Sequence, residues 1–162
     1  NIINRSFFSV YALVGGSGAT LGICLYMTIK AKSKQYRTLG KLSWVAGLCG
    51  INEPLIFGMP VVLNPYMIIP FIAAPFISIV LAYFLTVINI LPRLTTIIPL
   101  GTPVVMSGFL AGGSAGWRVA LFQVAIIIIS ALIYLPFFKV IDKKAYDDEN
   151  VSESEAIKTQ TV

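Results

Sequence analysis

The 162-residue chain is too apolar for an ordinary soluble domain, because 57% of its residues are hydrophobic and only 12% are charged. A soluble domain carries roughly twice that charged fraction. Its formal net charge of +5 does not indicate nucleic-acid binding, since the basic residues gather in short connections between apolar stretches instead of covering a soluble face. The composition therefore indicates a membrane protein.

The first apolar stretch, residues 9–29, predicts a membrane span. It contains the sequence Gly-Gly-Ser-Gly-Ala-Thr at residues 15–20, which lacks the Gly-Lys-Ser/Thr ending of a phosphate-binding loop. We interpret these small residues as a surface that lets membrane helices approach closely. The connection over residues 30–41 is rich in lysine and arginine, so we expect it on the cytoplasmic side.

The next stretch, residues 42–63, is apolar but crowded with helix-breaking residues. Proline removes a backbone donor and disfavours an α conformation in the residue before it. Such breaks are tolerated at membrane depth only where protein or a wet cavity satisfies the freed backbone groups. We therefore predict a re-entrant or interrupted helix with its break near Glu53-Pro54. The residues responsible are Gly47, Gly50, Pro54, Gly58 and Pro60.

Three further segments complete the predicted membrane part. Residues 65–91 predict a continuous span, residues 94–116 a second interrupted segment with several prolines and glycines, and residues 119–138 a final span. Interrupted segments of this kind surround the substrate site in many transporters. The fold class expected is an all-α polytopic membrane protein, with about three regular spans and two interrupted or re-entrant segments.

Two parts of different composition follow from this pattern. Residues 1–138 are expected to form the membrane-embedded part. Residues 139–162 are charged and poor in large apolar side chains, so we expect a disordered, cytoplasmic C-terminal tail. Because the chain begins with Asn1 and not with Met, we expect a fragment or a processed product.

Glu53 is the only charged residue between Leu42 and Pro92. An ionisable group within a membrane segment costs about 2.5 to 3.5 kcal/mol to insert and usually faces a cavity or the protein interior. We therefore expect a buried carboxylate that holds a polar ligand or takes a proton from one. The alternative role is structural, with the carboxyl group satisfying backbone groups freed by Pro54 and Gly50.

Three other polar residues are weaker candidates for ligand binding. Asn52 and Asn64 carry amides that suit recognition of hydroxyl groups or capping of broken helix ends equally well. Thr102 lies beside Pro103 in the second interrupted segment. The chain has no histidine, and Cys24 and Cys49 show no C-x-x-C spacing, so no metal site and no cofactor are expected.

The block around Glu53 resembles a known family signature. The sequence GINEPLIFGMPVVLNP, residues 50–65, is similar to the signature of enzyme IIC (EIIC) sugar permeases of the phosphoenolpyruvate-dependent phosphotransferase system. The branch is the lactose, cellobiose and diacetylchitobiose family. Trp117-Arg118 and residues 134–139 also resemble the last span of that family, so the likeness extends over most of residues 7–140.

The resemblance implies the C-terminal part of a multi-pass permease in a bacterial inner membrane, with a cytoplasmic C-terminus and a homodimeric assembly among lipids. It implies binding of a disaccharide such as cellobiose and phosphorylation of one of its hydroxyl groups by a cytoplasmic IIB partner. Glu53 would contact the hydroxyl to be phosphorylated as the catalytic and substrate-binding carboxylate, a role that suits an attacking oxygen losing its proton. Asn52, Asn64 and Thr102 would support it. Since the phosphoryl-carrying nucleophile belongs to IIB, the resemblance leaves open whether the permease itself counts as an enzyme.

The chain departs from the family pattern in several ways. A full family member is far longer, with an N-terminal set of helices that is not present here, so this piece is not expected to transport sugar by itself. The family histidine of the first re-entrant region is absent, and Leu100-Gly101-Thr102-Pro103 stands where the family has tryptophan before a Thr-Thr-Pro-like stretch. No fused IIB domain is visible, so a separate IIB polypeptide is expected. The alternatives are an ion-coupled secondary transporter of a small polar solute, with Glu53 as proton carrier, and a purely structural membrane subunit.

Overall fold

The computed structural model describes residues 2–59, 61, 64–99 and 101–160. Every regular element in these ranges is helical, which confirms the expected fold class. In chain order the elements are α1 (Arg5–Phe7), the π-helix η1 (Phe8–Ala12), α2 (Leu21–Lys30), α3 (Lys34–Leu48), α4 (Glu53–Gly58), α5 (Pro65–Val87), α6 (Val104–Ala111), the 3-10 turn η2 (Gly113–Ala115) and α7 (Gly116–Gln160).

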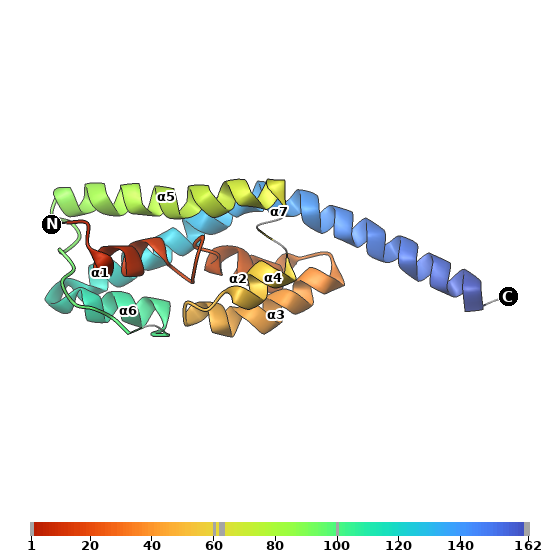
Figure 1. Ribbon diagram of the computed structural model, residues 1–162, viewed down its shortest axis with the longest axis horizontal. Helices are drawn as coiled ribbons and strands as arrows, with labels where there is room; N and C mark the ends of the chain where they lie inside the picture. The colour runs from red at the N-terminus through yellow and green to blue at the C-terminus, as the bar shows by residue number, and fades with distance from the viewer. Residues whose placement is uncertain (1, 60, 62–63, 100, 161–162) are drawn as a thin grey trace.

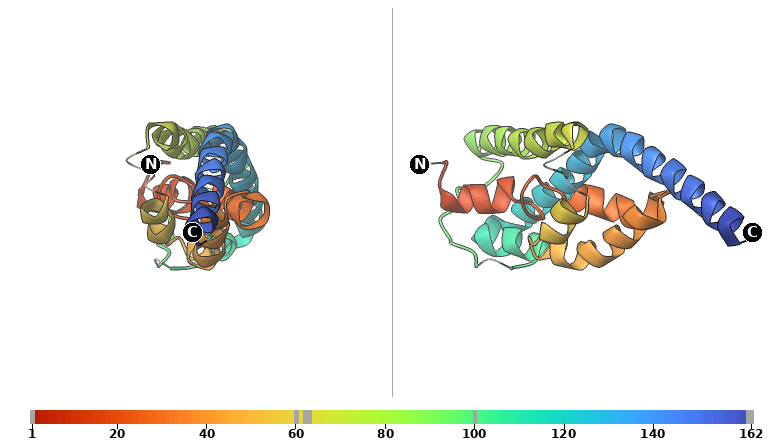
Figure 2. Two further views of the ribbon diagram at one scale, coloured as in Figure 1. Left: turned by 90° about the vertical axis from the view of Figure 1, so that its right-hand side faces the viewer. Right: turned by 45° about the vertical axis from the view of Figure 1, so that its right-hand side comes forward.

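Two of the described helices, α5 and α7, are long and apolar enough to cross a membrane. Figure 1 shows both running along the long axis of the molecule, with the shorter helices gathered on one side of α5. Helix α7 packs against α2, α5 and α6, and its C-terminal part projects beyond all the other helices in both figures (Figures 1 and 2). Helix α7 therefore holds the bundle together.

Helix α5 begins and ends where local sequence chemistry predicts. Asn64 precedes it as N-cap, and its side chain accepts a hydrogen bond from the Tyr66 amide. Pro65 occupies the first turn, where its missing N–H costs nothing. The helix ends just before Asn89, whose φ of 64° lies in the left-handed region. The prediction of a continuous span over residues 65–91 is thus confirmed as far as Val87.

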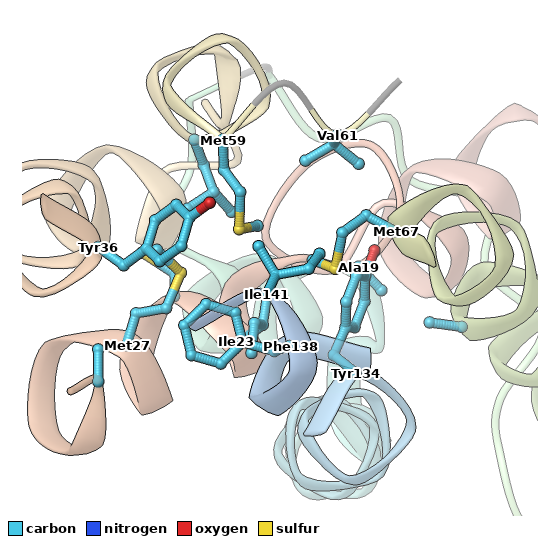
Figure 3. Close-up of a cluster of buried hydrophobic side chains, with 14 residues drawn as sticks. Ala19, Ile23, Met27, Tyr36, Met59, Val61, Met67, Tyr134, Phe138 and Ile141 are labelled. Atoms are coloured by element: carbon cyan, nitrogen blue, oxygen red, sulfur yellow. The ribbon is translucent and has the colours of Figure 1, made fainter. Parts of the chain in front are cut away.

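Two apolar clusters lie along successive parts of α7. One packs Ile126 of α7 against residues of η1 and α6. The other packs Tyr134 and Phe138 of α7 against α2, α3, α4 and the residue that follows α4. Figure 3 shows Met27 of α2, Tyr36 of α3 and Met59, the C-cap of α4, in this cluster. The apolar core of the described residues is thus divided into two clusters.

The expectation of a continuous first span over residues 9–29 is wrong. Helical structure stops at Ala12 and resumes at Leu21. Gly15, Gly16 and Gly18 between them have φ values of 74°, 93° and 79°, which glycine adopts without a steric penalty. The glycines therefore form a turn that interrupts the segment, so the described residues contain this break in addition to the two that were expected.

The basic connection is also shorter than expected. Helix α2 ends at Lys30 and α3 already begins at Lys34, so Arg37 and Lys41 lie on a helix. Ser33 explains the early start, because its side chain caps α3 by accepting a hydrogen bond from the Tyr36 amide. The predicted break near Glu53 is confirmed, since α3 stops at Leu48 and α4 begins at Glu53. Of the expected interrupted helix, residues 60, 62 and 63 lie outside the described residues.

The expectation of a disordered tail after residue 138 is not met in the described part. Helix α7 continues to Gln160. Residues 139–160 of α7, here called the extension, are bonded to the start of α3 through two carboxylates. Asp142 accepts hydrogen bonds from the backbone amides of Lys32 and Ser33, and Glu149 accepts them from those of Lys34 and Gln35. Composition alone did not reveal these contacts, because the two groups are more than a hundred residues apart in sequence.

Candidate functional site

A cavity of about 320 Å³ lies where the three interrupted segments meet. Its volume is at the lower end of the range for small-molecule sites. The lining comes from the first interrupted segment, from the break between α3 and α4, from the chain before α6, and from α6 and α7. The polar lining side chains are Ser9, Ser17, Cys49, Asn52, Glu53, Thr102, Ser107 and Gln123.

Asn52 fastens the break between α3 and α4 to the glycine turn. Its side chain is only 5% exposed, and its Nδ2 donates to the Ser17 carbonyl at 2.6 Å and to the Thr20 hydroxyl at 2.8 Å. Gly16 makes this approach feasible, because a Cβ there would come within 2.6 Å of the Asn52 Oδ1. Asn52 makes no side-chain cap for α4. Both of its amide protons serve this cross-link.

Glu53 is the first residue of α4 and lines the cavity. Its side chain is exposed in this chain, whereas we expected a buried carboxylate; the reason is its place at the open start of a six-residue helix. A carboxylate in a first helical turn is favoured by the helix dipole. No hydrogen bond to its carboxylate occurs among the described residues, so the structure does not support the alternative in which it satisfies the backbone near Pro54.

Thr102 and Asn64 have different positions. Thr102 lines the same cavity as Glu53, and its hydroxyl donates to the Pro99 carbonyl at 2.8 Å, which shapes the turn before α6. Asn64 is not brought to that cavity. It caps α5 by accepting from the Tyr66 amide at 3.0 Å, and it borders a separate hollow beside α3 and the extension of α7.

Sequence reasoning missed Gln123, which is 1% exposed and lines the cavity from α7. Its Nε2 donates to the Val10 carbonyl at 2.9 Å and to the Ser107 hydroxyl at 3.2 Å. The signal was available, because Gln123 is an amide within an otherwise apolar predicted span. The argument applied to Glu53 extends to it: a polar group at membrane depth usually faces the protein interior.

The arrangement suits a neutral, hydroxyl-rich ligand. Amide and hydroxyl groups provide donors and acceptors, and apolar side chains from all three interrupted segments form the rest of the wall. Glu53 is the only charged side chain among the described residues that line the cavity. A carboxylate beside hydroxyl-binding groups can accept a hydrogen bond or a proton from a reacting hydroxyl.

Comparison with known proteins shows which family the chain resembles. The family profile "Phosphotransferase system, EIIC" matches residues 1–75. The chain is 40% identical over 156 residues to the putative permease IIC component YwbA of Bacillus subtilis, covering 95% of this chain and 35% of that protein. It is 39% identical over 151 residues to the cellobiose-specific EIIC component of Geobacillus stearothermophilus, covering 92% of this chain and 33% of that protein.

A solved structure shows the same fold. The crystal structure of the transporter ChbC, the IIC component of the N,N'-diacetylchitobiose-specific phosphotransferase system, matches with a TM-score of 0.87 at 35% identity. The match covers 93% of this chain and 35% of ChbC, so the chain spans about a third of the length of the proteins it resembles. The interrupted helices and the block around Glu53 thus have a family context, and this chain belongs to the EIIC family of the phosphotransferase system.

Proposed function

We propose that this chain forms the sugar-binding part of a phosphotransferase-system permease that carries a β-linked disaccharide, such as cellobiose, across a bacterial inner membrane. One observation carries the proposal: Asn52, Glu53 and Thr102, from two separate interrupted segments, line a single cavity. Permease relatives named for cellobiose and diacetylchitobiose support the substrate class.

In this proposal Glu53 acts on the hydroxyl that receives the phosphoryl group. As the hydroxyl oxygen bonds to phosphorus its proton must leave, and a carboxylate within hydrogen-bonding reach can accept it. The phosphoryl group comes from a phosphorylated cysteine of a IIB partner, whose S–P bond breaks as the O–P bond forms and whose thiolate is the leaving group. Asn52 and Thr102 orient the sugar, and they are secondary to Glu53 because each already bonds to the backbone.

The basic residues suggest which side IIB approaches from. Lys30, Lys32 and Lys34 lie near the extension of α7, because Asp142 and Glu149 of that extension bond the backbone of residues 32–35. Lysine-rich connections favour the cytoplasm, so the extension and the C-terminus are assigned to that side. A positive surface there would attract an anionic phospho-donor. Homodimerisation within the lipid bilayer belongs to the same proposal.

Inverted membrane vesicles containing the full-length parent protein and phosphorylated IIB test the proposal. Labelled cellobiose and related glycosides are offered to wild type and to Glu53→Gln, which keeps the side chain's shape and removes its basicity. Phosphorylated sugar should form with wild type and be strongly reduced with Glu53→Gln, while sugar binding persists. A variant as active as wild type would refute the role of Glu53.

The same vesicles separate the alternatives. An ion-coupled transporter would accumulate unmodified sugar under a proton gradient without phosphoenolpyruvate, and Glu53→Gln would abolish that coupling. A purely structural subunit would leave the variant indistinguishable from wild type in both assays.

A further inference from the structure

A buried hydrogen-bond acceptor without a donor lies at the cavity wall. Gln123 uses both protons of its amide, one on the Val10 carbonyl of η1 and one on the Ser107 hydroxyl of α6. Its Oε1 is buried and has no hydrogen-bond partner among the described residues. Leaving such a group unsatisfied incurs its full desolvation penalty, so an orphaned acceptor next to a cavity calls for an explanation.

The orientation of this amide is dictated by its neighbours. The Val10 carbonyl can only accept a hydrogen bond, so the nitrogen of the amide must face it. Ser107 donates its own proton to the Val104 carbonyl and can therefore receive one from Gln123. Turning the amide around would break both bonds, and the oxygen is thereby held on the remaining side.

Helix α6 leaves room for that oxygen. A Cβ at Gly108 would overlap Oε1 and would lie 2.8 Å from Cδ of Gln123. The absence of a side chain at residue 108 therefore lets the amide sit between α6 and α7. Gln123 also lines the cavity, so the cavity is the side from which a ligand donor can approach this amide.

We propose that Gln123 is a substrate-recognition residue whose Oε1 accepts a hydrogen bond from one hydroxyl of the bound glycoside. This inference rests on the proposed function. It adds to the sugar site a residue of α7, outside the two segments that carry Asn52, Glu53 and Thr102. The amide nitrogen is bonded to η1 and α6, so the hydrogen bond to the sugar would also depend on the positions of these two helices.

A cycle of protein variants and deoxy sugars tests this assignment. Dissociation constants are measured for cellobiose and for its mono-deoxy analogues with wild type and with Gln123→Met, which keeps the length of the side chain but lacks the amide. We expect Gln123→Met to bind cellobiose about tenfold more weakly. One analogue should bind wild type about tenfold more weakly and lose nothing further in the variant. Ser130→Ala, on the same face of α7 but away from the cavity, is the control and should preserve wild-type discrimination among the analogues.

Gly108→Ala provides a second variant if Gln123→Met does not fold. It retains Gln123 but pushes a methyl group into the position of Oε1, so the same analogue should again lose its disadvantage relative to cellobiose. If each analogue loses the same affinity relative to cellobiose in both variants as in wild type, Oε1 accepts no hydrogen bond from the sugar. The inference is then overturned while the proposed function stands. If wild type binds none of the disaccharides, the proposed function and the inference fall together.

Discussion

The junction between the α7 extension and the start of α3 can be tested by removing one carboxylate. Asp142 is 5% exposed. Its Oδ2 accepts from the Lys32 amide at 2.9 Å, and its Oδ1 accepts from the Ser33 amide at 3.0 Å. Asp142→Ala would leave both backbone donors without these partners at a site where Ser33 is fully buried.

The expected cost follows from those two bonds. A hydrogen bond to a charged group contributes about 1.5 to 3 kcal/mol. Part of that is recovered, because the Lys32 amide is only partly buried and can find water. We therefore expect Asp142→Ala to lower stability by about 2 to 4 kcal/mol, a loss of several degrees in the thermal midpoint.

Thermal unfolding of the detergent-solubilised protein, followed by size-exclusion chromatography, measures this loss. Asp147→Ala is the matched control, since Asp147 lies on the same helix with the same charge but is exposed. Hydrogen exchange at residues 32–36 should quicken in Asp142→Ala alone. Equal midpoints and equal exchange in the two variants would refute the view that the extension of α7 is docked on α3.

Three further changes probe the cavity and its surroundings by the same thermal assay. Asn52→Ala removes the donors to Ser17 and Thr20 and should cost about 1 to 3 kcal/mol while weakening sugar binding; unchanged stability would contradict the cross-link. Gly16→Ala places a side chain at a φ of 93° and against the Asn52 amide, so it should destabilise more than Gly50→Ala, where φ is also positive but no atom lies within 4 Å. Asn64→Ala removes the cap of α5 and should cost about 1 kcal/mol without changing cellobiose affinity; weaker binding would instead return Asn64 to the ligand site.

Much of the architecture was readable from local sequence. Runs of uncharged apolar residues predicted the spans that became α5 and the apolar part of α7, since a membrane-spanning helix must be long and apolar. The prolines and glycines around Glu53 predicted a break, and α3 and α4 are separated there. The block over residues 50–65 also pointed to the family that the comparisons show. Each of these properties depends on neighbouring residues alone.

What only the tertiary structure decided are the pairings between distant segments. The glycines at residues 15–18 suit close helix packing and a left-handed turn equally well, and the contact with Asn52 together with the positive φ values identifies the turn. Asn52 and Asn64 looked alike in sequence, yet one lines the cavity and the other caps α5. Among its described residues, the extension of α7 packs only Ile141 and Ala145 against the apolar core, and its carboxylates accept from backbone donors more than a hundred residues away. Hydrogen bonds to the backbone leave no signature in side-chain composition, so only the folded chain reveals them.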